Sequence, residues 1–456
     1  MDELTTGLHP VDVENLLALL NRIVDSGSTI IMNEEENMME EKQKALVVGV
    51  DLNGERDFEY SMKELANLAE ANDIEVVFEV TQKLERINTA HYIGTGKIED
   101  IARIIDQKDI KTVIFNDELS HTQIRNLEEK LSCRVIDRTF LILKIFESRA
   151  KTKEAQLQVE MATLQYMLPR LMGLGKSLGH QGGGSGLKNR GSGETKIELG
   201  RRKIEDRIII LKKQLEELVA ERKVQRRKRN RKEIKVIALV GYTNAGKSTI
   251  MNNMLNLCSH PADKKVFEKD MLFATLETSV RNIVLPDNKE FLLTDTVGFI
   301  SKLPHHLVKA FRSTLEEVTE ADLLIHVVDY SDEMYKTHID VTNKTLKELG
   351  VVDIPTIYAY NKIDLVESEE KKAEEGCVYI SAKNNIGLDE LLNKIHEQIF
   401  ADYISFKVLI PYDKGSIVSY LNENANIKRA SHENEGTLIS LECRKSDYEK
   451  YKQYEV

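Results

Sequence analysis

The stretch that decides the fold is Val236-Ile-Ala-Leu-Val-Gly241-Tyr-Thr-Asn-Ala-Gly246-Lys247-Ser248. Its first five residues are apolar and predict a buried strand, and the glycine-containing loop leads into a helix-like segment. The pattern Gly-x4-Gly-Lys-Ser is typical of a phosphate-binding loop, in which backbone amides and a helix N-terminus surround oxyanions. We expect Lys247 to reach the β and γ phosphates and Ser248 to offer its hydroxyl to Mg²⁺.

A second nucleotide motif follows the apolar strand that ends at Asp295 and reads Asp-Thr-Val-Gly298. A carboxylate at a strand end can hold hydrated Mg²⁺, and Gly298 can present its amide to a γ phosphate because it has no side chain. Thr275, in the segment Leu-Phe-Ala274-Thr275-Leu-Glu, can supply a second magnesium hydroxyl from a loop that orders with the γ phosphate. Taken alone, this threonine is more typical of a structural role.

Two later strand ends indicate which base is bound. Asn361-Lys362-Ile-Asp364 closes the strand-like run Thr-Ile-Tyr-Ala-Tyr, and Ser381-Ala382-Lys383 follows Cys-Val-Tyr-Ile. A carboxylate at 364 accepts two hydrogen bonds from the N1 and N2 edge of guanine, which adenine cannot donate, while the stem of Lys362 covers the ring. The Ala382 amide can reach guanine O6. The ordered set predicts GTP as the nucleotide.

Composition limits the remaining classes of protein. The 456 residues suggest about three domains at roughly 150 residues each, and 41% hydrophobic residues can support packed cores. No apolar run approaches the roughly 18 residues of a membrane span, and the N-terminus lacks a secretory pattern. The four widely separated cysteines indicate neither a zinc site nor a disulfide framework. The net charge of -11 argues against indiscriminate nucleic-acid binding but permits local basic surfaces. We expect a cytoplasmic protein.

The predicted fold class is α/β. A P-loop domain with a mostly parallel sheet follows an α/β N-terminal domain with a long helical hairpin, and precedes a small α+β domain. We expect an acidic extension at 1–42, an α/β subdomain at 43–145, the hairpin at 146–233, the nucleotide-binding domain at 234–401 and the α+β domain at 402–456. In the last of these, the order is strand, helix, strand, strand.

Two apolar seams with steps of three and four residues predict the hairpin. Their members are Leu157, Met161, Leu164, Leu168 and Leu171 in the first, and Ile204, Ile208, Leu211, Leu215 and Leu218 in the second. The connection at 171–200 contains ten glycines, and we expect it not to form regular helix. Residues 222–235 are strongly basic, which favours contact with rRNA over the alternative of a solvated helix face.

The motifs together resemble the P-loop GTPases, and longer phrases resemble the HflX subfamily of ribosome-associated GTPases. These phrases are YIGTGKIEDI at 92–101, RGSGETKIELGRRKI at 190–204, GYTNAGKST, FATLE, DTVGFI, NKID and SAK, and the resemblance covers nearly everything after residue 40. It implies a GTPase that forms GDP and phosphate and binds the large (50S) ribosomal subunit and its rRNA. It further implies splitting of stalled or stressed 70S ribosomes, with the hairpin tip inserted toward the peptidyl-transferase region.

The expected site is large. The predicted catalytic residues are Lys247, Asp295 and Gly298, and the predicted magnesium ligands are Ser248 and Thr275. Nucleotide contacts are expected from Gly241, Tyr242, Thr243, Asn244, Ala245, Gly246, Lys247, Ser248, Thr249, Ala274, Thr275, Asp295, Thr296, Val297, Gly298, Asn361, Lys362, Ile363, Asp364, Ser381, Ala382 and Lys383.

Two positions depart from or extend the usual pattern. Phe299 follows Gly298 where Ras-like enzymes carry a water-orienting glutamine, so we expect slow intrinsic hydrolysis and activation by the ribosome. Asn244 matches the position at which potassium-activated GTPases hold K⁺ beside the phosphates. The alternative is that Asn244 only satisfies loop amides, and turnover in potassium against sodium distinguishes the two.

Alternatives to the leading hypothesis stay open at this point. YIGTGK at 92–97 lacks the spacing of a P-loop, and is either a weak ATP site or a plain strand-to-helix turn. The chain can instead be an RNA-binding ribosome assembly or storage factor that uses nucleotide as a sensor, or an ATP-driven RNA remodeller. We expect a monomer away from the ribosome.

Overall fold

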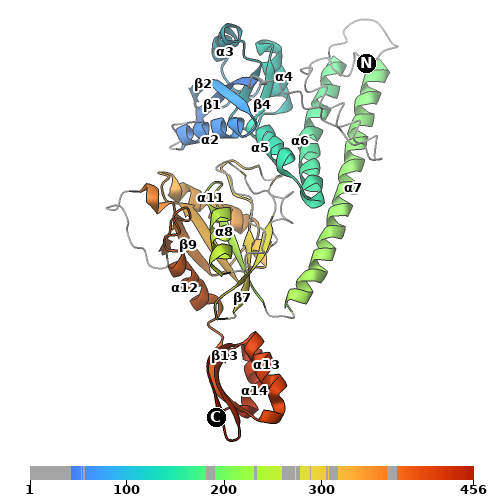
Figure 1. The fold of residues 1–456 in the computed structure, drawn as a ribbon. Helices are drawn as coiled ribbons and strands as arrows, with labels where there is room; N and C mark the ends of the chain where they lie inside the picture. Colours follow the sequence, from blue (N-terminus) through green and yellow to red (C-terminus); the bar gives the residue numbers. More distant parts are fainter. Residues whose placement is uncertain are drawn as a thin grey trace, which may run out of the picture. The chain divides into compact units, whose positions relative to one another are not determined.

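The computed structural model describes residues 43–52, 54, 57–180, 190–230, 234–258, 273, 278–287, 289–304, 307, 317–366 and 377–456, with backbone alone at 171–180, 190–197 and 222–230. The acidic extension, Ala274 and Thr275 lie outside the described residues. The chain divides into two compact units (Figure 1). Unit 1 comprises residues 1–221 and 301–311, and unit 2 comprises residues 222–300 and 312–456.

Unit 1 begins with strands that alternate with helices, as expected. The elements are β1 (Gln43–Leu52), α2 (Phe58–Glu70), β2 (Ile74–Leu84), α3 (Thr95–Lys108), β3 (Thr112–Phe115), α4 (His121–Leu131), β4 (Arg134–Asp137) and α5 (Arg138–Arg149). The strands pair in the order β2-β1-β3-β4, and every pairing is parallel. Because β1 and β3 are buried on both faces, they read as continuous apolar runs, Ala-Leu-Val-Val and Val-Ile-Phe.

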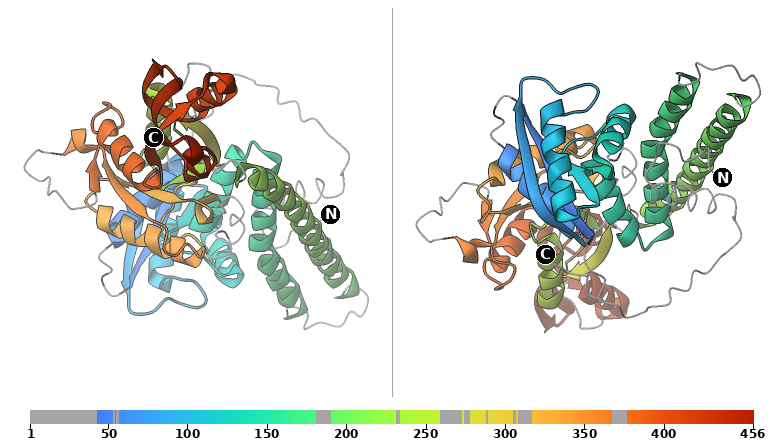
Figure 2. Two further views of the ribbon diagram at one scale, coloured as in Figure 1. Left: turned by 90° about the horizontal axis from the view of Figure 1, so that it is seen from below. Right: turned by 90° about the horizontal axis from the view of Figure 1, so that it is seen from above.

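The helical hairpin consists of α6 (Lys153–His180) and α7 (Arg190–Asn230), which lie side by side in every view (Figures 1 and 2). Both predicted seams meet in one apolar cluster. Its buried members are Leu157, Leu164, Ile204, Leu211 and Leu215, and Met161, Leu168, Ile208 and Leu218 pack against them. Leu171 falls among the residues described by backbone alone. The two seams therefore predicted the pairing of α6 with α7.

The expectation that residues 171–200 are not regular helix was wrong for most of that segment. Helix α6 continues to His180 and α7 begins at Arg190, so several glycines lie inside helices. A single glycine costs a helix only about 1 kcal/mol relative to alanine, which a long continuous helix can absorb. The densest glycines, at 182–184 and 186, fall in 181–189, outside the described residues.

Unit 2 contains the P-loop sheet. Its strands are β5 (Lys235–Gly241), β6 (Ser279–Val284), β7 (Glu290–Asp295), β8 (Leu323–Asp329), β9 (Thr356–Asn361) and β10 (Cys377–Tyr379), and its helices include α8 (Lys247–Cys258), α11 (Tyr335–Glu348) and α12 (Leu388–Ile399). The strand order is β10-β9-β8-β5-β7-β6, and only the β6–β7 pairing is antiparallel. The predicted, mostly parallel sheet is confirmed.

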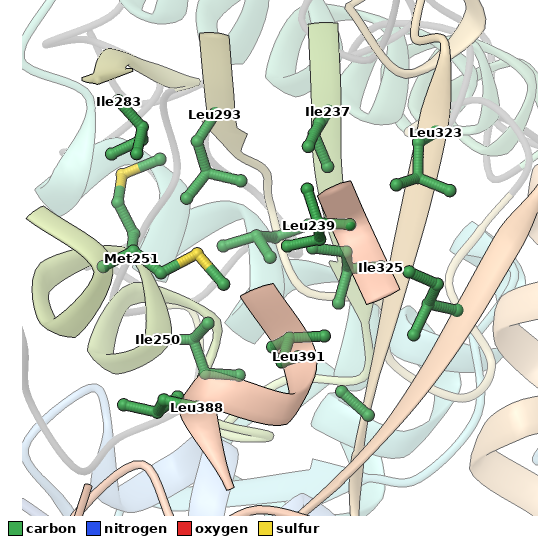
Figure 3. Packing of buried hydrophobic residues seen from close by; sticks show 14 of the residues in the cluster. Ile237, Leu239, Ile250, Met251, Ile283, Leu293, Leu323, Ile325, Leu388 and Leu391 are labelled. Carbon is green, nitrogen blue, oxygen red and sulfur yellow. The ribbon is translucent and has the colours of Figure 1, made fainter. Parts of the chain in front are cut away.

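The core of this sheet lies against α8 and α12. Figure 3 shows Leu239 and Leu293, from β5 and β7, turned toward Ile250 and Met251 of α8 and toward Leu391 of α12. All five are fully buried. This packing holds the strand that precedes the P-loop and the helix that follows it in one rigid block.

A smaller antiparallel sheet ends the chain. Its elements are β11 (Ile404–Ile410), α13 (Gly415–Asn424), β12 (Asn426–Glu433), β13 (Gly436–Cys443) and α14 (Lys445–Tyr451), with 3-10 turns at Tyr412–Lys414 and Lys452–Tyr454. The strand order is β11-β13-β12. The predicted strand, helix, strand, strand order is confirmed, but α14 was not predicted. This helix has seven residues, and its contact with the core comes from the partly buried Tyr448 and Tyr451, a pattern too short to indicate a helix in the sequence.

No helix among the described residues has the length and apolar character that crossing a membrane requires.

One buried histidine lies in the middle of the P-loop sheet. His326 of β8 is 1% exposed, and its Nδ1 has no hydrogen-bond partner among the described residues. Burial, reinforced by the positive charge of Lys247, lowers the pKa of His326 to about 3. The ring is therefore neutral in the folded protein, although it titrates near 6.5 once the chain unfolds.

We predict that this histidine makes unit 2 acid-sensitive. Between pH 6.5 and 3 the unfolded state binds one more proton at His326 than the folded state, so its contribution to stability falls as the pH falls, by about 1.4 kcal/mol per pH unit. His326→Leu should remove that slope. Urea titrations at pH 7, 6 and 5 measure the free energy of unfolding, and hydrogen exchange in β8 reports on unit 2. Equal dependence of that free energy on pH in the two proteins would contradict the prediction.

Candidate nucleotide-binding site

The expected site residues lie at the carboxyl ends of neighbouring strands. Strand β5 ends at Gly241, β7 at Asp295 and β9 at Asn361, and β10 ends just before Ser381. Strand β5 lies between β7 and β8. The connection that follows β5 runs to β6 and β7 on one side of it, and the connection that follows β7 runs to β8 on the other side. Ligands of open α/β sheets bind at this edge, where the strand order switches direction.

Glycine is required at both ends of the P-loop. Gly241 has φ 147°, and a Cβ there would lie 2.2 Å from the carbonyl oxygen of Val327. Gly246 has φ 95°, and its Cβ would lie 2.2 Å from the Nδ2 of Asn361. A side chain at 241 would collide with the backbone of β8, and one at 246 would displace the Asn361 amide and strain the backbone. The two glycines thus let the loop turn inward against β8 and β9.

Lys247 is buried at the first turn of α8. Its ammonium donates to the carbonyl oxygens of Gly241 at 3.1 Å and Tyr242 at 2.7 Å. Burial lowers the pKa of Lys247 to about 8, against the opposing attraction of Asp295. Burial thus removes most of the water around the ammonium, and two carbonyl oxygens and the charge of Asp295 replace it. A phosphate group would restore a full counter-charge, which is the electrostatic basis for expecting Lys247 to bind the β and γ phosphates.

The structure brings Ser248 and Asp295 together. The Ser248 Oγ donates to the Asp295 Oδ2 at 2.6 Å, and Asp295 is fully buried. A hydroxyl and a carboxylate at this distance form an oxygen pair that suits Mg²⁺, which takes few protein ligands and fills its other positions with water and phosphate oxygens. The residues present therefore fit a magnesium ion, with Ser248 as direct ligand and Asp295 beside it.

Backbone hydrogen bonds join the Asp-x-x-Gly segment to the P-loop. The Thr243 amide donates to the Phe299 carbonyl at 2.8 Å, and the Phe299 amide donates to the Gly241 carbonyl at 3.1 Å. A Cβ on Gly298 would lie 2.7 Å from the Thr243 Cα, so glycine is required for this approach. Phe299 is 2% exposed. Its ring is buried and has no polar group, so it cannot position a water molecule as a glutamine would.

Asn361 joins the phosphate side of the site to the base side. Its Nδ2 donates to the Ala245 carbonyl in the P-loop at 2.8 Å, and its Oδ1 accepts from the Ala382 amide at 2.9 Å. The Ser381 hydroxyl in turn donates to the Asp364 Oδ1 at 2.6 Å. The P-loop, the Asn-Lys-x-Asp segment and the Ser-Ala-Lys turn thus form one connected network.

Several contributors to this network were not predicted from the sequence. Asp329, the last residue of β8, pairs with Lys362 at 2.7 Å, and His338 of α11 stacks on Tyr242 with ring centroids 3.9 Å apart. Asn253 of α8 donates to the Ala382 carbonyl. Asp329 had a usable signal, since it is a carboxylate at a strand end like Asp295. The other two depend on contacts between distant segments.

Some expected contacts have another role in the structure. The Thr296 hydroxyl donates to the Leu239 carbonyl at 2.7 Å, so this side chain fastens the Asp-x-x-Gly loop to β5. Asn244 is exposed with φ 59°, a left-handed conformation that asparagine tolerates better than most residues. This backbone requirement accounts for an asparagine at 244 whether or not K⁺ binds there.

The N-terminal YIGTGK segment forms a turn held by its own unit. The Gly94 amide donates to Gln82 at 3.0 Å, Tyr92 is buried with φ 68°, and α3 begins at Thr95.

A cavity of about 760 Å³ lies elsewhere in unit 1, between the start of α4 and the hairpin. There Arg170 is neutralised by Asp137 at 2.9 Å. Burial, with the charges of Arg170 and Arg125, lowers the pKa of His121 to about 4. Neither feature offers phosphate an environment like that of the P-loop.

The chain is similar to known proteins over most of its length. Residues 59–147 match the family described as GTP-binding GTPase N-terminal, residues 149–229 match GTP-binding GTPase Middle Region, and residues 236–362 match 50S ribosome-binding GTPase. The protein named GTPase HflX of Caldanaerobacter subterraneus subsp. tengcongensis is 45% identical over 407 residues, which span 89% of this chain and 92% of the relative. The chain belongs to the HflX family of GTPases.

Further HflX proteins show the same extent of similarity. That of Lacrimispora saccharolytica is 39% identical over 90% of this chain and 95% of its own length. That of Escherichia coli K12 is 35% identical over 88% and 93%. The resemblance inferred from the sequence phrases is therefore confirmed, and HflX membership makes the chain a GTPase.

We predict that Asn361→Ala weakens GDP binding by roughly 10- to 100-fold. The substitution removes two buried hydrogen bonds and leaves the Ala245 carbonyl and the Ala382 amide without those partners, at about 1–3 kcal/mol in all. Fluorescent GDP titration measures the affinity. Asn424→Ala is the matched control, because Asn424 is an exposed asparagine that also donates to a backbone carbonyl. An Asn361→Ala protein with the affinity of the control would contradict the bridging role.

Proposed function

We propose that this HflX-family GTPase binds the large (50S) ribosomal subunit in its GTP-loaded state and splits stalled ribosomes, with hydrolysis to GDP and phosphate resetting it. The observation that carries the proposal is the combination of two parts in one chain. One is a P-loop domain matching a family described as 50S ribosome-binding GTPase, and the other is a long helical hairpin with a basic end. We further propose that the protein is cytoplasmic, because it would meet ribosomes there, and that it is a monomer away from ribosomes.

The hairpin has the length and charge for insertion into RNA. Helix α7 has 41 residues and thus spans roughly 60 Å. Its C-terminal end contains Arg226, Arg227, Lys228 and Arg229, which can neutralise phosphates. Earlier in α7, Ile209 and Ile210 are exposed side by side, an unusual place for apolar residues unless they meet a partner.

The nucleotide would control this binding through charge. In the proposed site, Lys247 and the P-loop amides hold the β and γ phosphates, and Ser248 and Thr275 ligate Mg²⁺ with Asp295 in support. Magnesium, when bound, supplies Lewis-acid stabilisation of the charge that develops on the phosphates. The Gly298 amide would sense the γ phosphate. Because the Phe299 ring is buried and carries no hydrogen-bonding group, hydrolysis depends on groups or ordering that the ribosome provides.

Guanine selection is proposed for Asp364. Its carboxylate is exposed at the site, with one oxygen engaged by Ser381, and the Lys362 stem is oriented by the ion pair with Asp329. An exposed carboxylate held by a hydroxyl is ready to accept from the N1 and N2 groups of guanine. Among the described residues we see no comparable site for adenine, so the ATP-driven alternative has less support.

We predict that Asp364→Asn redirects preference away from GTP. An amide keeps only one acceptor and places an NH₂ group against the donors of guanine, so affinity for GTP should fall roughly 10- to 100-fold. Binding of xanthosine triphosphate, which has a carbonyl at C2, should improve. Competition titrations with both nucleotides measure the shift. Asp353→Asn, at an exposed aspartate before β9, is the control. Unchanged GTP preference would reject the assignment.

We predict that the protein with a non-hydrolysable GTP analogue converts intact ribosomes to subunits in sucrose gradients, and that with GDP it does not. Replacing Arg226, Arg227 and Arg229 by glutamine should reduce splitting and flatten its salt dependence, because fewer phosphates are neutralised. Replacing the exposed Lys336, Lys344 and Lys347 of α11 by glutamine removes the same three charges and is the control for net charge. Binding to the large subunit without splitting would instead favour the assembly or storage factor.

A further inference from the structure

A buried lysine lies at the turn of the β6–β7 hairpin, at the far end from the nucleotide site. Lys289 is 2% exposed, although lysine is almost never fully buried without partners. The turn is closed by a hydrogen bond from the Leu285 amide to the Lys289 carbonyl at 2.8 Å. Nothing in the proposed GTP chemistry requires a lysine here, so its burial needs another explanation.

The partners of Lys289 come from three separate parts of unit 2. Its Nζ lies 3.4 Å from Asp287 in the same turn, 2.7 Å from the His396 Nε2 on α12, and 3.2 Å from Glu442 on β13. The rings of Phe400 and Tyr403 lie at 5.3 and 5.0 Å, so the cation also faces two aromatic side chains. Lys289 thus connects the hairpin turn with the last strand of the C-terminal sheet.

A second contact repeats the connection one residue further on. Glu290, the first residue of β7, accepts from Asn282 of β6 at 3.1 Å and pairs with Arg444 at 3.6 Å. Arg444 follows β13 directly and also donates to the Tyr403 hydroxyl at 3.1 Å. We call Lys289, Glu290, Glu442 and Arg444 the hairpin lock.

The hairpin lock restrains the C-terminal sheet more firmly than the chain connection alone. Only residues 400–403 separate α12 from β11, and such a short segment still permits a rotation. A rotation of β13 away from the hairpin would leave Lys289 buried without the Glu442 carboxylate. Asp287 would then be the carboxylate left beside the ammonium, and losing one of two carboxylate partners of a buried charge is destabilising, so the pair penalises separation. Lys428, by contrast, pairs with the same carboxylate at 3.6 Å but is largely exposed, and its loss would cost little.

The other end of the same hairpin belongs to the nucleotide site. Strand β7 ends at Asp295. This residue is paired with Ser279 of β6 in the strand register, and its carboxylate accepts a hydrogen bond from the Ser248 hydroxyl. The segment that contains Thr275 joins the start of β6. Six paired residues make the hairpin a stiff element of about 20 Å. A displacement at Asp295 and Ser279 would therefore also move Lys289 and Glu290.

We propose that Lys289 is a positioning residue that ties the C-terminal sheet to the β6–β7 hairpin, so that the nucleotide bound at the P-loop sets the orientation of that sheet. The C-terminal sheet would then report GTP or GDP to whatever contacts it. By linkage, a partner that selects one orientation would change nucleotide affinity to the same degree. The inference rests on the proposed nucleotide site and does not require the ribosome.

The test is hydrogen exchange on the full chain, saturated with GDP or with a non-hydrolysable GTP analogue. In the wild type, amides of β11 and β13 should exchange at rates that differ about fivefold or more between the two states, the lower range of common coupling strengths. In Lys289→Met that difference should vanish while nucleotide affinity stays within about threefold of wild type. Glu442→Gln removes the charge of the partner and should give the same result. It keeps the test decisive even where Lys289→Met does not fold.

Lys428→Met is the matched control, since it removes an exposed lysine that pairs with the same glutamate, and it should keep the wild-type difference. Direct nucleotide titration separates the two hypotheses. A wild type that fails to bind GTP would reject the proposed site, whereas one that binds GTP and shows equal exchange in both states would reject the coupling. A nucleotide-dependent difference that persists in both Lys289→Met and Glu442→Gln would overturn the role of the lock.

Discussion

The buried ammonium of Lys247 is the interaction on which the rest of the site depends. Removing a lysine from water costs free energy, and here burial lowers its pKa to about 8. The surrounding structure tolerates this charge because two P-loop carbonyls accept from it and Asp295 lies close enough to attract it. The same charge contributes to keeping His326 neutral within the sheet. A nucleotide phosphate completes a charge arrangement that the folded protein already holds in place.

Rigidity around this charge comes from close backbone packing. Gly241, Gly246 and Gly298 each approach another segment so closely that a Cβ would collide with it. The backbone of Thr243 and Phe299 forms a short ladder between the P-loop and the Asp-x-x-Gly segment, and Asn361 spans to the base side. The site is thus preorganised by hydrogen bonds that do not involve the nucleotide. Such preorganisation reduces the reorganisation needed on binding.

The two ends of the β6–β7 hairpin have different electrostatic environments. At Asp295 a carboxylate meets a hydroxyl and a lysine, and at Lys289 an ammonium meets carboxylates, an imidazole and aromatic rings. At the Lys289 end, burial raises the pKa of Asp287, but the His396 hydrogen bond and the Lys289 charge outweigh it and leave that pKa lowered. The carboxylate therefore stays charged and holds its lysine. A stiff strand pair between two charged ends can relate nucleotide state to a distant surface without any flexible relay.

The sequence by itself determined the P-loop domain, its parallel sheet and the identity of the bound base, because glycines, strand-end carboxylates and apolar periodicity are local signals. It also predicted the pairing of α6 with α7, since both seams follow helical spacing. The tertiary structure alone decided that glycines in α6 and α7 stay helical, that the short helix α14 forms on the C-terminal sheet, and that His338 and Asn253 join the site. It alone placed Lys289 against Glu442, more than 150 residues away in the chain. The sequence does not show whether a charged side chain is buried, because its burial depends on residues that become its neighbours only when the chain folds.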